Sequence, residues 1–519
     1  MGQNWLPWRS LKEKLYQLTA LSIKTSFDAN ETKNVDVCII GTGAGGAVVG
    51  YHLAQSGLKV LMLEKGDYYS HDQIKSETRE ENLQKLWKNR GAQVTRLPLL
   101  AITQGECVGG STIINYGMCF RVPNETLQIW KSETGVEFSK DELHNEYTEV
   151  EKQIQVRKIT DAGLSHEKLE LGCKKLGYSG NWMYKNYIAD EGGIKQNVLF
   201  SYLEKANPQN LEIYANCKAT KILKNGNKIS GIQAVHTNND KTVTIDVKST
   251  IVVLSAGTIA SSELLLQNKI ANSSGHVGKH LSFHPASSVI AQFDHVINGQ
   301  NDLSMAFHCD EFGIVKTKKP GFMIESVFIS PATFSTATFS TATPGIGEEN
   351  AEFIGKYDYS AVAGVLIQDE ANGNISLNWS NDAVVDYILS DTDGEKLLKG
   401  LKTVAEIFFA AGATKVITGH IQKTVLESTD DLSLIDERGS GLGSFRLVSA
   451  HPQGGNRMGA DKKTSIVNSY CRSHDVENLY ICDASVFPTS LGVNPQLTVM
   501  TIASLAAKKI LEQKTDIFG

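Results

Sequence analysis

The feature that most constrains the fold lies near the start of the chain, where a short apolar run leads into a glycine-rich turn. Residues 35–40 read Val-Asp-Val-Cys-Ile-Ile, residues 47–56 have helical composition, and a second apolar run, 59–63, ends at Glu64. The turn itself contains small residues that let the backbone approach a phosphate: Gly41, Gly43, Ala44 and Gly46. Such a turn holds a diphosphate at a helix N-terminus, and the acid binds ribose hydroxyls. The pattern predicts a dinucleotide-binding unit of an α/β fold, with a tight βα turn as the alternative.

A second constellation lies near the other end of the chain. His451 stands in the turn His-Pro-Gln-Gly-Gly, and Asn494 stands in Gly-Val-Asn-Pro, just before helical sequence. Between them, residues 478–483 read as a buried strand that ends in Asp483. Because Gly/Pro turns beside strands direct side chains into clefts, we expect these residues to line a site.

The composition is that of a large globular enzyme. The chain has 519 residues, of which 41% are hydrophobic and 21% charged, which allows more than one domain. A net charge of −6 and a pI near 6.1 provide no basic field for nucleic acid. Eight cysteines without a CxxC pair indicate buried thiols in a reducing compartment, and no metal site is implied.

The N-terminal segment has an amphipathic pattern. Residues 5–21 begin with two tryptophans and then mix apolar with charged residues. Such a helix lies on a bilayer or, more often, packs on its own protein. The uninterrupted apolar core of a signal peptide or transmembrane helix is missing. We therefore expect a cytoplasmic protein, with peripheral membrane contact through residues 5–21 as the alternative.

The rest of the chain alternates between two kinds of sequence. Strand patterns with turns occupy residues 211–257, a block rich in Val, Ile, Phe and Thr covers residues 286–390, and a helix is expected from Gly394 to Ala411. We expect a discontinuous Rossmann-like domain with an inserted α+β substrate domain built on an antiparallel sheet. The expected divisions are an N-terminal helical extension, 1–34; three segments of the nucleotide-binding domain, 35–125, 201–285 and 441–519; a helical cap and substrate-domain segment, 126–200; and the substrate-binding domain, 286–440.

Several unrelated motifs follow one another in a fixed order. They are Gly41-X-Gly43-X-X-Gly46, Gly109-Gly-Ser-Thr-Ile-Ile-Asn115, Ser255-Ala-Gly-Thr-Ile-Ala-Ser-Ser-Glu-Leu-Leu, His451-Pro-X-Gly-Gly and Gly492-Val-Asn-Pro. The chain thereby resembles the glucose-methanol-choline (GMC) flavin oxidoreductases over residues 35–510. Residues 277–285, 319–325 and 410–415 make it most similar to the long-chain alcohol oxidase and cholesterol oxidase branches.

The resemblance implies FAD as the cofactor. The residues implied to contact it are Gly41, Gly43, Ala44 and Gly46 at the diphosphate, Glu64 at the ribose, Ala219 at the adenine, Asp483 and Ala484 at the ribityl chain and diphosphate, and Gly109, Gly110, Asn115, Asn494 and Pro495 at the flavin. The sequence departs from the family at residues 105–107, Gly-Glu-Cys, where many relatives carry an arginine or lysine. No histidine for covalent attachment is evident in this loop, which implies bound but untethered flavin.

By position, His451 and Asn494 match the family's catalytic pair, and alcohol oxidation calls for such a pair independently. Hydride transfer from an alcohol carbon frees a hydroxyl proton, which an imidazole can accept near neutral pH. A carboxamide can hold the substrate oxygen in register. Pro495 begins a helix whose positive end favours reduced flavin. As alternatives, Asn494 only caps that helix, and His451 only satisfies a buried turn.

Two further polar residues lie in motifs that could reach the site. Glu325 lies within Phe-Met-Ile-Glu-Ser-Val-Phe, where it either acts as a buried proton relay or faces solvent from an edge strand. His284 precedes Pro285, and we expect it to be structural rather than catalytic.

The leading hypothesis is an FAD-dependent enzyme that oxidises a CH-OH group, with His451 as the base. Apolar runs in residues 286–440 favour a long-chain or sterol-like alcohol, because a sugar site needs many more polar groups. Oxygen or an electron carrier would reoxidise the flavin. The alternatives are a sugar or polyol dehydrogenase that passes electrons to a quinone or cytochrome, and a flavin-binding protein without catalysis.

Overall fold

The computed structural model describes residues 21–96, 100–160, 162–187, 195–238, 241–328, 348–441 and 443–518. Apart from Leu21, the amphipathic pattern of residues 5–21 lies outside the described residues, so membrane contact through it stays a prediction. Within the described ranges, no helix combines the length and the apolar character needed to cross a bilayer.

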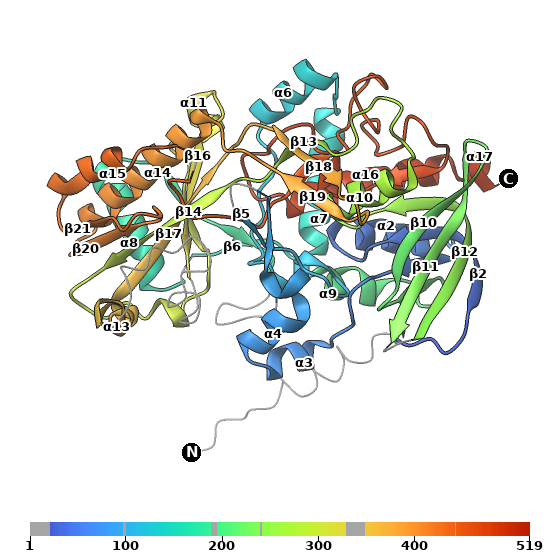
Figure 1. The fold of residues 1–519 in the computed structure, drawn as a ribbon, viewed down its shortest axis with the longest axis horizontal. Helices are drawn as coiled ribbons and strands as arrows, with labels where there is room; N and C mark the ends of the chain where they lie inside the picture. Colours follow the sequence, from blue (N-terminus) through green and yellow to red (C-terminus); the bar gives the residue numbers. More distant parts are fainter. Residues whose placement is uncertain are drawn as a thin grey trace.

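The nucleotide-binding part is built on the sheet at the right of Figure 1. Its parallel strands lie in the order β1, β9, β3, β2, β12 and β24. Their bounds are β1 (Ser22–Lys24), β2 (Glu31–Ile40), β3 (Val60–Leu63), β9 (Leu211–Tyr214), β12 (Lys241–Leu254) and β24 (Leu479–Ile481). The apolar runs 37–40 and 251–254 are buried, as expected for strands covered on both faces. An antiparallel ribbon, β10 (Lys218–Asn225) and β11 (Lys228–Asn238), extends the sheet beyond β12.

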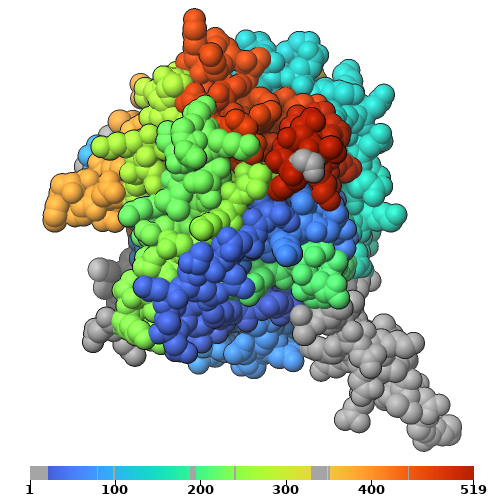
Figure 2. Space-filling model, turned by 90° about the vertical axis from the view of Figure 1, so that its right-hand side faces the viewer, coloured from blue at the N-terminus to red at the C-terminus, as the bar shows by residue number. Residues whose placement is uncertain are grey.

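Helices from distant parts of the chain cover this sheet. Helix α16 (Gln496–Glu512) packs against α2 (Ala44–Gln55) and α7 (Lys140–Gln153), and α10 (Thr258–Asn268) follows β12. Figure 2 shows the start, middle and end of the chain side by side on one face of the molecule. The discontinuous Rossmann-like domain expected from the sequence is therefore confirmed, while the exact domain limits stay predictions.

A second, mainly antiparallel sheet lies at the left of Figure 1. Its order is β4, β5, β22, β14, β17, β16, β15 and β7, with β20 and β21 branching from β14. The bounds are β4 (Gln93–Val94), β5 (Leu100–Ile102), β7 (Gly180–Trp182), β14 (Ala286–Gln292), β15 (Phe307–Cys309), β16 (Phe322–Val327), β17 (Ser360–Ile367), β20 (Lys415–Thr418), β21 (Val425–Leu426) and β22 (Leu447–Ser449). Helices α8 (Leu164–Leu176) and α14 (Asp391–Ala410) pack on it. This sheet is the core of the inserted α+β domain.

A smaller sheet joins strands from the nucleotide-binding part and from the inserted domain. Its order is β19 (Ala383–Asp386), β18 (Gly373–Leu377), β13 (Lys279–Ser282) and β23 (Gln453–Gly455). The remaining elements are β6 (Arg157–Lys158), β8 (Tyr184–Lys185), α3 (His71–Ser76), α4 (Arg79–Leu86), η1 (Lys88–Gly91), α5 (Ser111–Ile114), α6 (Asn124–Thr134), α9 (Val198–Ser201), η2 (Leu203–Lys205), η3 (Gly299–Asn301), α11 (Ile314–Thr317), α13 (Glu348–Gly355), η4 (Tyr357–Tyr359), η5 (Thr429–Leu432), α15 (Ser433–Arg438), η6 (Ala484–Val486) and α17 (Lys514–Phe518).

Helix α14 begins at Asp391, earlier than the expected start at Gly394. The Ser390 hydroxyl accepts a hydrogen bond from the Asp393 amide at 3.2 Å and caps the helix. Gly394 lies inside the first turns of the helix. A glycine is needed at this position because a Cβ would stand 2.3 Å from the Ser440 carbonyl oxygen. The glycine therefore marks a close approach of backbones rather than a helix boundary.

Candidate active site

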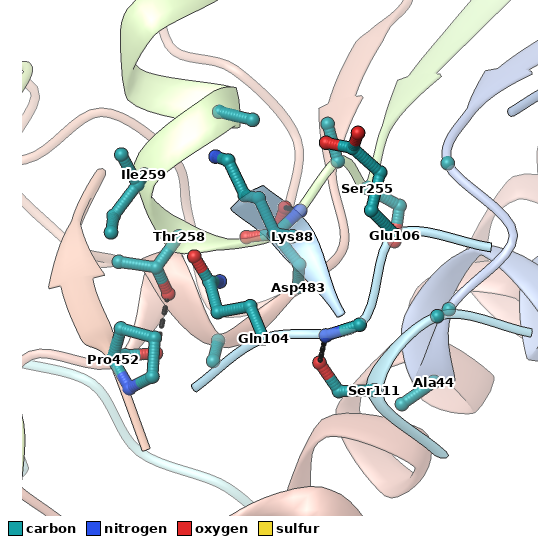
Figure 3. Close-up of a pocket in the computed structure, with 18 of the residues that line it drawn as sticks. Ala44, Lys88, Gln104, Glu106, Ser111, Ser255, Thr258, Ile259, Pro452 and Asp483 are labelled. Atoms are coloured by element: carbon teal, nitrogen blue, oxygen red, sulfur yellow. Dashed lines mark hydrogen bonds between the residues drawn. The ribbon is translucent and has the colours of Figure 1, made fainter. Parts of the chain in front are cut away.

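A cavity of about 600 Å³ lies where the first, middle and last segments of the chain meet. Twelve of the predicted site residues line it: Gly41, Gly43, Ala44, Glu64, Gly110, Asn115, Ala219, His451, Asp483, Ala484, Asn494 and Pro495. Gly46, Gly109 and Glu325 do not form part of this wall. Figure 3 shows Ala44, Ser255, Thr258 and Asp483 facing the same space.

The fingerprint glycines serve different purposes. A Cβ on Gly41, whose φ is +96°, would lie 2.3 Å from the Ser255 carbonyl oxygen, and one on Gly46 would lie 2.1 Å from the Gly41 oxygen. These two glycines permit close packing of protein backbone. Around Gly43 the nearest atom is the Gly110 Cα at 4.0 Å, so this glycine leaves open space in front of helix α2. A diphosphate fits such a backbone-lined gap at a helix N-terminus.

Glu64 is buried at the end of β3 and is oriented by three hydrogen bonds. Its carboxylate accepts from the Thr42 amide at 3.1 Å, the Thr42 hydroxyl at 2.7 Å and the Gly66 amide at 3.0 Å. Burial raises its pKa, and these bonds oppose the shift. The Gly109 amide donates to the Thr42 hydroxyl at 3.0 Å, so Gly109 supports Glu64 from behind. Sequence reasoning missed Thr42, although its hydroxyl follows the first fingerprint glycine.

Asp483 joins two parts of the cavity wall. Its carboxylate accepts hydrogen bonds from the Gly257 amide at 3.0 Å, the Ser261 hydroxyl at 2.5 Å and the Ser485 amide at 2.9 Å. The carboxylate thereby occupies the N-terminal end of α10 and fixes the turn that carries Ala484. Burial raises the pKa of Asp483.

Asn115 belongs to a polar network at the other end of the cavity. Its side-chain amide donates to the Gln496 side-chain oxygen at 2.7 Å, and the Gln496 side-chain amide donates to the Met118 carbonyl at 2.9 Å. The buried Lys195 ammonium donates to the Ile113 carbonyl at 2.8 Å and contacts the Asn115 side-chain oxygen at 3.3 Å. Sequence reasoning missed Gln496 and Lys195, because neither belongs to a glycine-rich motif.

His451 and Asn494 lie together at this end. Their side-chain nitrogens, Nε2 and Nδ2, are 3.3 Å apart. Burial lowers the pKa of His451 to about 4, so its imidazole is neutral at pH 7. The structure thus brings the predicted pair into contact within the cavity wall.

His284 lies directly behind His451. The Nδ1 atoms of the two rings are 3.4 Å apart, and the Gly492 amide donates to Nε2 of His284 at 2.8 Å. The Asp369 carboxylate accepts from the Phe283 and His284 amides at 2.9 and 3.0 Å. His284 has a φ of +49°, which these anchors hold in place. It therefore contacts the predicted base while remaining fully buried.

Glu325 is buried in β16 with only 3% of its surface exposed, which excludes the solvent-facing alternative. Burial raises its pKa to about 8, although a hydrogen bond with the Asn494 side chain and the charge of Lys185 oppose this shift. Its Oε1 atom has no partner among the described residues. Asn494 thus connects His451 with Glu325.

The capping alternative for Asn494 is wrong. Helix α16 begins at Gln496, no side chain caps its N-terminus, and Pro495 occupies the N-cap position. The Asn494 Oδ1 atom is buried without a hydrogen-bond partner in the described part of the chain. The side chain is turned toward His451 and Glu325 instead of the helix amides.

Comparisons with known proteins identify the family of the chain. Two family models, both described as GMC oxidoreductase, match residues 39–286 and 369–503. The chain is 27% identical to an uncharacterized GMC-type oxidoreductase of Mycobacterium tuberculosis over 94% of this chain and 77% of that protein. It is 26% identical to the long-chain-alcohol oxidase FAO3 of Arabidopsis thaliana, over 95% of this chain and 70% of that protein.

Solved structures share the fold. A formate oxidase of Aspergillus oryzae superposes with a TM-score of 0.73 at 17% identity, over 94% of this chain and 100% of that one. The pyridoxine 4-oxidase of Mesorbium loti gives a TM-score of 0.67 at 15% identity, over 92% and 99% of the two chains. With the family models covering most of the sequence, the chain belongs to the GMC oxidoreductases and is an FAD-dependent oxidoreductase.

Proposed function

We propose that this protein oxidises the CH-OH group of a hydrophobic alcohol at the end of the cavity that holds His451 and Asn494. The observation that carries the proposal is the contact of these two side chains, with the buried Glu325 next to Asn494. The likeness to long-chain-alcohol oxidases supports an alcohol as the donor. When bound, FAD supplies the hydride acceptor, and oxygen or an electron carrier then reoxidises it.

In this proposal His451 accepts the hydroxyl proton. Its imidazole is neutral at pH 7 because burial lowers its pKa to about 4, so a nitrogen lone pair is available. Asn494 lies 3.3 Å away and is placed to hydrogen-bond the same substrate oxygen. Fixed placement of two groups around one oxygen contributes to the rate by orientation.

A second candidate for the proton acceptor is Glu325, and one observation favours it. The Gly492 amide donates to Nε2 of His284, so neutral His284 carries its proton on Nδ1, which faces Nδ1 of His451. Neutral His451 then carries its own proton on Nε2, and the Asn494 side chain would have to present its oxygen there instead of Nδ2. In that tautomer the alcohol proton would pass to the Glu325 carboxylate, which lies behind the cavity wall beside Asn494 and would need a bridging water. The two acceptors give different pH profiles.

The walls around the site support an apolar substrate. Met118, Ile259 and Val499 line the cavity. Each methylene moved from water into such surroundings contributes about 0.8 kcal/mol, or roughly fourfold in binding. A sugar would leave hydroxyls without partners, at about 1–3 kcal/mol for each.

The test is anaerobic reduction of the bound flavin by a series of primary alcohols from butanol to decanol, with glucose as the control. We expect kcat/KM to rise with chain length and to be poor for glucose. A flat series with efficient reduction by glucose would replace this proposal with the polyol dehydrogenase. A protein that no alcohol or sugar reduces would instead support a flavin-binding protein without catalysis.

A further inference from the structure

Two short segments that contact each other carry side chains into the middle of the cavity. The Lys88 amide donates to the Gln104 carbonyl at 2.9 Å, and the Glu106 amide donates to the Leu86 carbonyl at 2.8 Å. Figure 3 shows the Gln104 side chain between Thr258 and Ser111, and the Lys88 side chain extending past it toward Ile259. These residues belong to the polar sequence between the fingerprint and the Gly109-Gly110 turn.

The charge of Lys88 is not neutralised by a direct contact. Its ammonium has no hydrogen-bond or ion-pair partner in the described ranges, and burial lowers its pKa. The neighbouring Lys65 also lines the cavity, but its ammonium lies 2.6 Å from the Glu106 carboxylate. The cavity lining therefore holds three lysines: Lys65 is paired, Lys218 is exposed, and Lys88 is the half-buried one whose ammonium has no partner among the described residues.

Gln104 is also incompletely satisfied. Its side-chain oxygen, Oε1, is buried without a partner among the described residues. A buried amide oxygen of this kind costs free energy unless a ligand or water supplies a donor. The Lys88 ammonium and the Gln104 carboxamide oxygen, both without a partner among the described residues, thus come from two segments joined by backbone hydrogen bonds and reach into the same cavity.

We propose that Lys88, supported by Gln104, binds the diphosphate of FAD from the side of the cavity opposite the N-terminus of α2. The diphosphate carries two negative charges, and the backbone at Gly43 and Ala44 provides a dipole and amide donors but no full positive charge. The α10 N-terminus does not compete for the anion, because Asp483 already occupies it.

This assignment explains the departure of residues 105–107 from the family pattern. Those positions read Gly-Glu-Cys and supply no cation, since Glu106 is acidic and pairs with Lys65. Lys88 reaches the same cavity from the segment that pairs with residues 104–106. Lys88 thus supplies, from an earlier place in the sequence, the positive charge that the family pattern would put just before the Gly109-Gly110 turn. The assignment concerns cofactor binding and is independent of the substrate proposed above.

The experiment measures FAD release from the purified holoprotein after dilution, followed by flavin fluorescence. Lys88→Met should release FAD about ten to a hundred times faster than the wild type, the range for losing a charge-assisted hydrogen bond. Lys88→Arg should retain most of the binding. The matched control is Lys65→Met, which removes the paired lysine from the same wall and should change the release rate much less.

A second measurement identifies the phosphate as the target. After FAD removal, the full-length chain is titrated with FAD and with riboflavin, which has the flavin ring without phosphate. Lys88→Met should weaken FAD binding and leave riboflavin binding unchanged, and raising the salt concentration should weaken FAD binding less in this variant than in the wild type. Equal losses for both ligands, or an unchanged affinity for FAD, would overturn the proposal whatever the alcohol series shows.

Discussion

Backbone atoms form much of the cavity surface at its nucleotide end, around Gly43. Buried side chains form the surface at its reaction end, which is the end that holds His451 and Asn494. Gly43 and Gly110 leave a gap bounded by main chain, and Glu64 is held by three hydrogen bonds. At the other end, the Oδ1 atom of Asn494 and the Oε1 atom of Glu325 are buried without partners in the described chain.

In the proposed function, this difference separates cofactor binding from chemistry within one cavity. Backbone groups bind phosphate without titrating, so the gap in front of Gly43 keeps its properties over a wide pH range. The reaction end contains groups whose pKa values burial has moved apart, to about 4 for His451 and about 8 for Glu325. Unsatisfied buried groups reduce stability and are found where function requires them.

The largest expected effect follows from removing His451. His451→Ala should keep FAD bound, because the nucleotide end is unchanged, but should slow flavin reduction by about two to four orders of magnitude. Stopped-flow reduction by decanol under anaerobic conditions measures the rate, and the flavin absorbance measures occupancy. Loss of FAD together with the rate would show that the two ends are not independent.

A smaller effect is expected from two glycine substitutions at the nucleotide end. Gly43→Val should fold, because the nearest atom to a Cβ is 4.0 Å away, but should weaken FAD binding about a hundredfold by filling the gap. Gly41→Ala should lower the thermal stability of the chain itself, because its Cβ would lie 2.3 Å from the Ser255 oxygen at a positive φ. Calorimetry with and without FAD distinguishes the two cases.

The sequence predicts the nucleotide end better than the reaction end, for a physical reason. The fingerprint Gly41, Gly43 and Glu64 is local in sequence, and its geometry follows from one β-α-β unit. Likewise, His451 and Asn494 stand in recognisable turns. The contacts of Glu325 and His284 depend on the approach of β16 from the inserted domain and of the segment that follows β13, so no local pattern shows whether these residues are buried.

Local capping rules failed at Asn494 for the same reason. An asparagine before a proline at the start of a helix is a favourable cap in isolation. In the folded protein its side chain contacts His451 and Glu325, which are distant in sequence. Gln496 and Lys195 were missed because their roles arise only when separate loops meet around the cavity. Thr42 lies within the fingerprint turn, and only its contact with Glu64 shows its role.

The pH profile of flavin reduction distinguishes the two proton acceptors. With His451 as the acceptor, the rate should be nearly constant from pH 6 to 9 and should fall only as the pH approaches about 4, where the imidazole becomes protonated. With Glu325 as the acceptor, the rate would fall about tenfold per unit below pH 8, and Glu325→Gln would abolish that slope. The profiles of wild type and variant, measured by stopped flow, decide between them.

Glu325→Gln should also change stability in a pH-dependent way. The folded pKa of Glu325, about 8, lies above its ordinary value of 4.5, so the folded state holds this proton more tightly than the unfolded state. Its contribution to stability is therefore present below about pH 4.5 and is lost as the pH rises to about 8. The variant lacks this loss, so its Tm advantage over the wild type should grow between pH 5 and 8. A constant difference would contradict the raised pKa.

The smallest effect concerns Asn494, where the structure changes what the aspartate variant should do. An N-cap role would make Asn494→Asp as stable as the wild type and Asn494→Ala less stable. Because Asn494 caps nothing and faces the buried Glu325, the aspartate would place a second carboxyl group in a desolvated position. We expect Asn494→Asp to be less stable than Asn494→Ala by about 1–3 kcal/mol at pH 8, with the gap narrowing as the pH falls and the carboxyls protonate. Urea unfolding of the two variants at pH 6 and pH 8 measures the difference, and a more stable aspartate variant would restore the capping role.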